Sequence, residues 1–432
     1  MIHIIHNLIW GGLILGSGLF LYYSLREREI RAALICAAAI VLISAVAVLT
    51  DNVPQYLTLT LDSFILFILI LLILPLDQPH PTSYQASPTR YDERDIMFAR
   101  ARYERGSPAY VDYYTRRPET KNIDDTIRKL PELLEMGGTY YKANPARIAD
   151  AYFETIQKMH TFCDDQPISP PVSLDKKTAT DQVKSMARSL GACDVGITAV
   201  KPHHLYTHIG RRIPEYGTPV ILNHDQAVVF ALEMDYDIIK SAPTMPVIVE
   251  SSRQYLRAAF IAVTLARFIR SHGYEARAHI DGNYLAILPA LAVDAGLGEI
   301  GRLGYCIHPR FGARIRLGAV TTTMPLHHDS PVTFGVQKFC RLCVKCAEQC
   351  PAGAISFGNE KNIRGVRKWS THQESCYRYW RQIGTDCAIC MMVCPYSKPA
   401  TLPHNIIRFI IKRNKISRRL AVRLDSLLYP RI

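Results

Sequence analysis

Three long apolar runs open the chain, at residues 8–23, 32–49 and 57–76. Each run is close to the length of about 20 residues that a helix needs to cross a bilayer. A cleaved signal peptide is the alternative for the first run, but no basic segment precedes it and two more runs follow. Asp62 in the third run could pair with a neighbouring helix or lie near a proton path, but its place toward the outer end of the run favours shallow solvation. The pattern predicts three transmembrane helices within residues 1–76.

The basic residues around these runs predict their orientation. The first connection carries Arg26, Arg28 and Arg31, whereas residues 51–56 contain no Lys or Arg. Connections rich in Lys and Arg tend to stay in the cytoplasm, and three crossings return the chain to that side. The segment that follows is again basic, with Arg90, Arg94, Arg100, Arg102, Arg105, Arg116 and Arg117. We expect a multi-pass protein of the inner (cytoplasmic) membrane, with soluble domains facing the cytoplasm.

The rest of the chain changes pattern twice. Residues 77–170 should form a linker and an N-terminal extension, and the polar, Pro-containing part at 77–121 should be a tether with little regular structure beyond one surface helix. From residue 171, helical and strand periods alternate. The expected strands are at 194–199, 227–232, 274–280 and 314–322, and the expected helices at 184–190 and 253–272. This alternation predicts a compact α/β domain over residues 171–330, with the broadly apolar second helix in its core.

Eight of the twelve cysteines form two compact groups that each end in Cys-Pro. A CxxCxxCxxxCP run holds one [4Fe-4S] cluster with three thiolates and sends the fourth to a second cluster. The predicted ligand sets are Cys340, Cys343, Cys346 and Cys394 for one cluster, and Cys376, Cys387, Cys390 and Cys350 for the other. Cys376 is the variant position, because eleven positions instead of three separate it from Cys387. Zinc ribbons lack the trailing Cys-Pro, so a dicluster ferredoxin domain is predicted over residues 331–400.

A GxGxxG motif is formed by Gly296, Gly298 and Gly301. As a dinucleotide-binding signature it is weak, because such a motif should follow a strand and have an acidic residue about 20 positions later. Here it follows a helical pattern at 284–294, and residues 318–326 contain no acid. The glycines instead predict a loop whose backbone approaches a bulky ligand closely.

These motifs resemble those of the reductive dehalogenases. The similarity rests on residues 339–351, 368–369 and 376–380 of the ferredoxin module, and on residues 295–302 and 314–322 upstream. It covers about residues 171–400 and does not include the membrane segment. Respiratory members of that family are typically exported and meet a separate membrane anchor protein. The anchor expected here is fused to an inward-facing enzyme.

The resemblance implies a nitroreductase-like α/β (α+β) core that binds base-off cobalamin, which is reduced through the two [4Fe-4S] clusters. The sequence has no Asp-x-His-x-x-Gly motif, which fits a cobalt without a protein ligand. The implied corrinoid-binding residues are Gly296, Gly298, Gly301 and Arg302. The implied proton donor is Tyr255, supported by Arg316 and Asn283. The neighbouring guanidinium should lower the phenol pKa from its usual value of about 10.

The function implied by the resemblance is the reductive removal of halide from a small organohalide by a membrane-anchored enzyme. A low-potential ferredoxin or flavodoxin is the expected electron donor. Quinol is a further option, although its potential is usually too high to reach cobalt(I). The lipid bilayer is an expected partner and nucleic acid is not. The sequence identifies neither the organohalide nor a respiratory or catabolic role.

Two other functions stay open. Epoxyqueuosine reductase is a related cobalamin enzyme with two clusters that acts on tRNA, and the net charge of +15 beyond residue 80 would suit a nucleic acid. That family has no transmembrane segment and uses an acidic proton donor, for which Asp281 is the candidate. A membrane-bound ferredoxin-type electron carrier is the other option, but it would leave residues 171–330 without a purpose.

The C-terminal tail, residues 401–432, is basic and amphipathic. From residue 404 it carries eight Lys or Arg and one Asp, interleaved with apolar residues. Such a tail can lie on the inner leaflet as an amphipathic helix. A helix that covers the cluster domain has the same pattern, so both placements stay open.

Overall fold

The computed structural model describes residues 2–51, 53–77, 89–364 and 366–429. The chain divides into two compact units. The membrane unit comprises Met1–Pro81, Lys338–Cys343 and Lys398–Ile432. The core unit comprises Thr82–Gln337 and Val344–Ser397.

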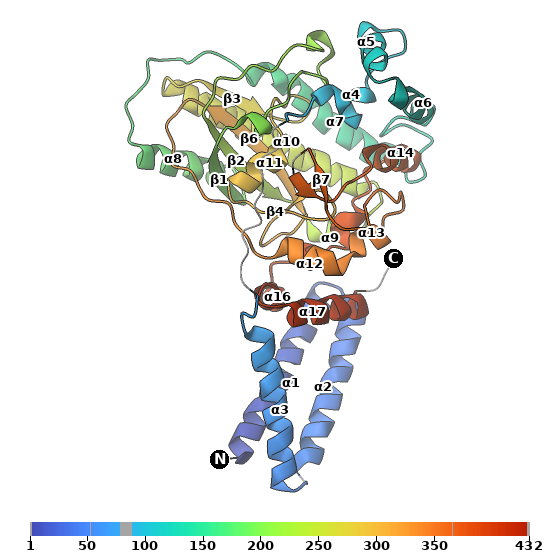
Figure 1. Cartoon of the computed structure of the whole chain (residues 1–432), viewed down its shortest axis with the longest axis vertical. Coiled ribbons are helices and arrows are strands. Elements are labelled where there is room, and N and C mark those ends of the chain that lie inside the picture. The colour runs from blue at the N-terminus through green and yellow to red at the C-terminus, as the bar shows by residue number, and fades with distance from the viewer. Residues whose placement is uncertain (1, 52, 78–88, 365, 430–432) are drawn as a thin grey trace. The chain divides into compact units, whose positions relative to one another are not determined.

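Three long helices form the body of the membrane unit: α1 (Ile2–Arg26), α2 (Ile30–Asp51) and α3 (Gln55–Ile73). They run side by side in Figure 1. Each is long and apolar enough to cross a membrane, as the apolar runs predict. Their large apolar side chains are mostly exposed, including Leu8, Leu15 and Phe64. Such an outward apolar surface is stable in lipid and costly in water.

Asp62 is buried inside this bundle, and the shallow solvation expected for it is wrong. Only 2% of Asp62 is exposed. Its carboxylate accepts a hydrogen bond from Trp10 Nε1 at 3.0 Å and lies 3.0 Å from His6 Nδ1. Both partners come from α1, so the carboxylate joins α3 to α1. An ionisable group in a membrane helix needs such partners, because hydrocarbon offers it no hydrogen bonds.

The C-terminal tail belongs to the membrane unit and forms two helices, α16 (Leu402–Ile411) and α17 (Lys415–Leu428). Figure 1 shows both lying across one end of the three long helices. Asn414 separates them and donates from its side-chain amide to the carbonyls of Leu71, Leu72 and Leu74, at 2.9–3.2 Å. The tail therefore satisfies backbone carbonyls that the end of α3 leaves unpaired.

Further polar contacts join the tail to the same end of the bundle. Glu27, just after α1, accepts hydrogen bonds from Thr401 at 3.0 Å and pairs with His404 at 2.9 Å. Arg31 of α2 donates to the carbonyl of Leu427 at 2.9 Å. All three long helices thus hold the tail, which fixes it beside the membrane segment.

A four-stranded antiparallel sheet forms the centre of the core unit. Its strand order is β1 (Asp194–Ala199), β2 (Gln226–Glu233), β6 (Ile315–Thr322) and β3 (Ala276–His279). All four strands expected from the sequence are present, with bounds that differ by a few residues. Two further two-stranded ladders pair β4 (Glu299–Ile300) with β5 (Cys306–Ile307), and β7 (Lys361–Ile363) with β8 (Val366–Lys368).

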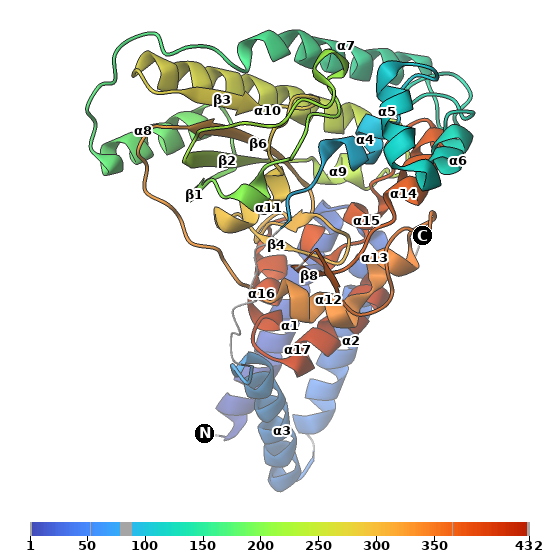
Figure 2. The same cartoon turned by 45° about the horizontal axis from the view of Figure 1, so that its top comes forward.

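Helices cover both faces of the sheet (Figure 2). One face packs against α10 (Pro246–Ser271) and α8 (Lys176–Ser189), and α7 (Ala143–Met159) lies outside α10. The other face packs against α11 (Leu288–Asp294). Strand β2 alternates accordingly, because Val228, Phe230 and Leu232 face α10 while Ala227, Val229 and Ala231 face α11. The sheet is therefore a fully covered middle layer.

Helix α10 begins earlier than the sequence pattern indicates, with Pro246 in its first turn. Tyr255 is therefore well inside the helix and not at its start. This position directs Tyr255 toward β6, which crosses beneath α10.

The segment expected to be a tether is largely helical where it is described. Residues 78–88 lie outside the described residues, and the chain then forms α4 (Met97–Arg100), α5 (Pro108–Arg116) and α6 (Pro118–Ile127). Their core is a tyrosine cluster that includes Tyr103, Tyr110, Tyr113 and Tyr114. Because tyrosine and a buried Arg100–Asp124 pair of 2.7 Å take the place of aliphatic residues, the segment has little hydrophobic periodicity.

The packing of α10 on the sheet gives a stability test. Leu265 is 0% exposed in this core, whereas Phe260 on the same helix is 52% exposed. Leu265→Ala should lower the free energy of unfolding by about 2–5 kcal/mol because it leaves a cavity. Phe260→Ala should change it by about 0.5 kcal/mol or less. Thermal unfolding midpoints of the purified chain check this, and equal losses for both variants would contradict the packing.

Candidate active site

The predicted ligands of the second cluster lie close together within the core unit. Burial, with Cys350 adding to it, raises the pKa of Cys376 to about 11. Burial also raises the pKa of Cys387 to about 12, and Cys376 and Cys350 add to that rise. Burial raises the pKa of Cys390 as well, and Cys376 and Cys387 add to that rise. The four side chains lie close enough for their thiolate forms to repel one another. Such a group of thiolates is a suitable ligand set for a cationic metal centre.

Secondary structure explains the long spacing before Cys387. Cys376 lies in the first turns of α14 (Gln373–Ile383), and the chain returns after this helix to place Cys387 near it. The additional residues between Cys376 and Cys387 therefore form one helix. Cys376 still lies beside the other predicted ligands of its cluster. Cys340 and Cys343 belong to the membrane unit, whereas Cys346 and Cys394 belong to the core unit, so the grouping of the first set stays a prediction.

Two backbone positions repeat between the cysteine groups. Val344 follows Cys343 with a φ of 44°, and Ala388 follows Cys387 with a φ of 50°. The backbone of both residues adopts the left-handed conformation that non-glycine residues seldom take. The same strained position directly after a predicted ligand in each group indicates two equivalent metal-binding loops.

Tyr255 and Arg316 form the centre of the candidate site. Tyr255 comes from α10 and Arg316 from β6, and the guanidinium carbon lies 5.1 Å from the centre of the phenol ring. Both side chains lie deep in the core unit and still keep some exposed surface. The structure thus brings together two of the three residues that the resemblance implies for catalysis.

Arg316 is held by two residues that sequence reasoning missed. Its guanidinium donates to Ser251 Oγ at 2.8 Å and lies 3.6 Å from the carboxylate of Asp386. Ser251 in turn donates to Asp386 at 2.5 Å. Ser251 is four residues before Tyr255 on α10, and Asp386 directly precedes Cys387. The ferredoxin module therefore supplies a carboxylate to the Tyr255 site, and its position next to a predicted ligand was the one available signal.

Burial dominates the acidity of the phenol. It raises the pKa of Tyr255 above its usual value, and Arg316 offsets only part of this rise. Arg316 acts in the expected direction, but the expectation of a lowered pKa is wrong because desolvation outweighs it. Tyr255 is consequently protonated at neutral pH, which is the state a proton donor requires.

Asn283 lies in a different contact. Its side-chain oxygen accepts a hydrogen bond from Arg277 at 2.6 Å, and its own backbone carbonyl accepts another at 3.3 Å. The side chain of Asn283 is thus tied to Arg277. On the neighbouring residues, Asp281 pairs with Arg211 at 3.3 Å and both influence the pKa of Tyr255. Arg211 was not found by sequence reasoning.

The glycine motif packs against the chain itself. A Cβ on Gly296, whose φ is 77°, would lie 2.5 Å from the carbonyl oxygen of Ser330. A Cβ on Gly298 would lie 2.2 Å from that of Ile307. Gly301 closes a tight turn by donating to the carbonyl of Tyr305 at 3.0 Å. The first two glycines are therefore required by close backbone packing, and a ligand is not needed to explain them.

Arg302 holds this turn to the ferredoxin module. Its guanidinium donates to the carbonyls of Ser356 at 2.6 Å and Gly358 at 2.9 Å, and it lies 4.8 Å from the ring of Trp369. In the same turn, Tyr305 interacts electrostatically with Cys390, Cys376, Arg316 and Tyr255. The turn thus connects the cysteine group to the Tyr255 site.

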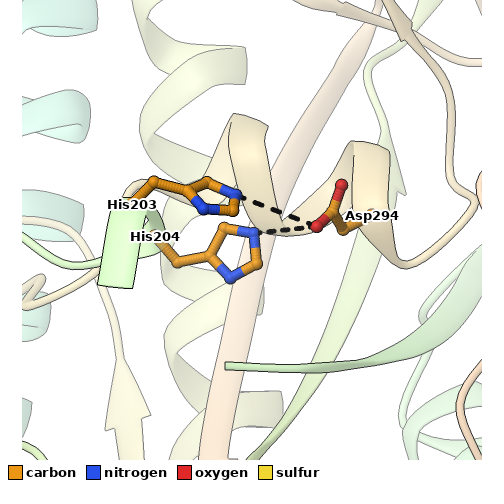
Figure 3. A group of neighbouring side chains, drawn as sticks. All are labelled: His203, His204 and Asp294. Atoms are coloured by element: carbon orange, nitrogen blue, oxygen red, sulfur yellow. Dashed lines mark ion pairs between the residues drawn. The ribbon is translucent and has the colours of Figure 1, made fainter. Parts of the chain in front are cut away.

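A second polar cluster lies at the end of α11. Figure 3 shows His203 and His204 pointing toward Asp294, at 3.9 and 3.2 Å. Three such ligand atoms could hold a metal ion. The ammonium of Lys201 already lies 2.6 Å from the same carboxylate oxygen. Burial would raise the pKa of Asp294, but His204 and Lys201 lower it to about 2, so the carboxylate is ionised and already paired with the Lys201 ammonium.

Comparison with known proteins gives matches over the ferredoxin module and the core. The 4Fe-4S dicluster domain family matches residues 339–398. The tetrachloroethene reductive dehalogenase of Sulfurospirillum multivorans is 29% identical over 293 residues, which cover 60% of this chain and 58% of that protein. One from Desulfitobacterium hafniense is 37% identical over 192 residues, covering 42% of this chain and 34% of that protein. The chain spans about half the length of the curated relatives it matches.

The fold leads to the same group of proteins. The catabolic reductive dehalogenase NpRdhA, solved with 3-bromo-4-hydroxybenzoic acid, has a TM-score of 0.66 and 25% identity, covering 82% of this chain and 48% of that one. A structure solved to explain B12-dependent dehalogenation has a TM-score of 0.60. Relatives by sequence, neighbours by fold and the dicluster motif all agree with the resemblance drawn from the sequence. In sequence and in fold, the chain is therefore similar to the reductive dehalogenases over about half of their length.

Proposed function

We propose that this chain is a membrane-anchored reductive dehalogenase, which removes halide from a small organohalide with electrons delivered through two [4Fe-4S] clusters to a base-off cobalamin. The observation that carries the proposal is the Tyr255–Arg316 pair, which Asp386 connects to the cysteine groups. The names of the relatives support the reaction, since they act on chlorinated ethenes. In the balanced reaction the carbon–halogen bond breaks, the substrate takes up two electrons and one proton, a carbon–hydrogen bond forms and halide leaves.

The residues present fit these cofactors. Cys350, Cys376, Cys387 and Cys390 supply four neighbouring thiols for one cluster. The site also contains buried polar atoms that have no hydrogen-bond partner among the described residues, including Arg316 Nε and Asp386 Oδ1. A large polar ligand such as a corrinoid, bound in a nitroreductase-like core, would be able to satisfy such groups. When bound, the corrinoid supplies a reduced cobalt centre that accepts the halogen or transfers an electron to the substrate.

Tyr255 acts as the proton donor in this proposal. Burial keeps the phenol protonated, and its hydroxyl hydrogen passes to the carbon as halide leaves. The phenolate that remains lies beside the cationic Arg316. At about 5 Å and an effective dielectric constant of about 20, this attraction is on the order of 3 kcal/mol. Ser251 and Asp386 orient the guanidinium so that this attraction is available when the charge forms.

The remaining implied residues receive narrower roles. We assign Gly296, Gly298 and Gly301 to the turn beside the corrinoid, where they allow close backbone packing. The contacts of Arg302 favour a role in holding this turn to the ferredoxin module. The side chain of Asn283 accepts a hydrogen bond from Arg277. We therefore propose that Asn283 supports the site indirectly, by ordering the turn in which it lies.

The three apolar helices support a multi-pass anchor in the inner membrane with the core unit in the cytoplasm. The arginines after α1 and after the third run carry this orientation. A low-potential ferredoxin or flavodoxin is the proposed donor. The tRNA-reducing alternative is weaker, because its candidate acid, Asp281, is engaged by Arg211. A halide-release assay on bromophenols and chloroethenes with the cofactor-loaded chain tests the proposal.

Tyr255→Phe should reduce halide release by about 10²- to 10⁴-fold, because the variant keeps the ring and loses the transferable proton. Iron and corrinoid content should stay unchanged. Tyr274→Phe is the matched control, since its hydroxyl donates to the carbonyl of Val172 at 2.9 Å outside the site. Full turnover by Tyr255→Phe would exclude this tyrosine as the donor.

Asp386→Asn should lower kcat by about 10- to 100-fold with little change in KM, because an isosteric neutral group holds Arg316 less firmly. Iron content should remain at that of the unmodified chain, which separates this effect from cluster loss. Glu233→Gln is the control, since it removes a carboxylate that pairs with Arg314, at 3.1 Å, instead of with Arg316. An unchanged kcat would show that Arg316 does not depend on Asp386.

Cys376→Ala should remove one cluster, so that iron falls from about eight to about four atoms per chain. Cys306→Ala should retain all the iron, because Cys306 is a buried thiol outside both ligand sets. Iron analysis and the visible absorbance of the clusters provide the measurement. Equal iron in both variants would remove Cys376 from the ligand set.

A further inference from the structure

A basic recess lies at the tail end of the membrane unit. Its volume is about 450 Å³, and it is lined by Leu76, Asp77, Lys338, Arg341, Leu342, Lys415 and Arg418. All of these residues belong to the membrane unit. Four cationic side chains and one carboxylate give the lining a net charge of +3, so the recess favours an anion.

The recess lies where the apolar part of the bundle ends. Leu76 and Asp77 follow the last turn of α3, and Lys415 is the first residue of α17. The side chain of Asn414, directly before Lys415, binds the final carbonyls of α3. In a membrane protein this is the level of the lipid headgroups, where cationic side chains meet lipid phosphates.

One cation in the wall is rigid. Arg418 is only 3% exposed, and its guanidinium pairs with Asp77 and donates to the carbonyl of Ile411 at 3.2 Å. Its Nε is buried and has no hydrogen-bond partner among the described residues. Because its side chain is already ordered, Arg418 can contribute to an anion site without a further loss of conformational entropy.

Helix α17 has the surface of a helix that lies in the headgroup layer. Ile416, Leu420, Leu424 and Leu427 are exposed at helical spacing on one side. Lys415, Arg419 and Arg423 are exposed beside them. An apolar stripe flanked by cations binds the boundary between headgroups and acyl chains of an anionic membrane.

We propose that the recess binds the phosphate headgroup of an anionic phospholipid, with Leu76 and Leu342 in contact with the apolar part of that lipid. A neutral quinone headgroup brings no charge to the cationic lining, whereas the phosphodiester of an anionic lipid brings a negative charge that the lining attracts. The proposal rests on the proposed membrane anchoring and does not depend on dehalogenation.

The lipid would also hold a cluster-bearing helix in place. Helix α12 (Val336–Cys343) carries Lys338 and Arg341 of the recess together with the predicted ligands Cys340 and Cys343. A headgroup bound between α12 and α17 therefore couples the order of this ligand helix to the lipid. The predicted consequence is that lipid stabilises the chain whether or not it turns over substrate.

The test uses the purified, cofactor-loaded full chain in neutral detergent. Phosphatidylglycerol should raise the thermal unfolding midpoint with increasing concentration, because a ligand of the folded state stabilises it. Phosphatidylcholine with the same acyl chains and inorganic phosphate alone are the two comparison probes, and both should give little shift. Equal stabilisation by phosphatidylcholine would overturn the charge argument, and equal stabilisation by inorganic phosphate would overturn the lipid as source.

Matched variants locate the site. Lys415→Gln combined with Arg341→Gln should weaken the apparent affinity for phosphatidylglycerol at least about tenfold, a loss of about 1.4 kcal/mol. Arg419→Gln combined with Arg423→Gln removes the same charge from α17 outside the recess and should change it much less. Equal losses in the two pairs would reduce the effect to general membrane charge and overturn the recess. Lys415→Gln alone, at an exposed position, provides the same comparison if the first pair does not fold.

Discussion

The burial of the Arg316 guanidinium is the constraint around which the candidate site is built. An arginine in a protein interior remains charged, so its neighbours must replace the water it has lost. Here the phenol ring of Tyr255, the hydroxyl of Ser251 and the carboxylate of Asp386 do so. These groups come from α10 and from the loop before Cys387. One buried cation thus requires the helix, the sheet and the ferredoxin module to meet at a single point.

The same burial sets the chemistry of Tyr255. Desolvation raises the pKa of the phenol more than the cation lowers it, so the proton stays on oxygen until a basic centre forms nearby. Once the proton leaves, the cation stabilises the phenolate in a medium that screens charge poorly. A surface tyrosine beside the same arginine would gain little from either effect. Depth in the fold therefore gives a common side chain the properties that the proposed acid function requires.

What could be predicted from the sequence was what local pattern encodes. The four strands, the three apolar helices and the cysteine groups follow from spacing within short windows, and all are present. The helices over residues 97–127 were missed because tyrosines build their core. Ser251 and Asp386 were missed for another reason, since they are 135 positions apart and no local period relates them. The partner of a buried polar group is chosen by the fold, which a single sequence does not display.

The membrane unit follows the rule that governs Arg316. Asp62 would be too costly in hydrocarbon without partners, and α1 supplies them in His6 and Trp10. The last carbonyls of α3 likewise need donors, and Asn414 supplies its amide from more than 300 positions along the chain. Because the C-terminal tail supplies the donors that the end of α3 needs, the tail is a structural part of the membrane unit. Its exposed cations and leucines then lie at the end of the apolar helices, which is the position that the proposed lipid site requires.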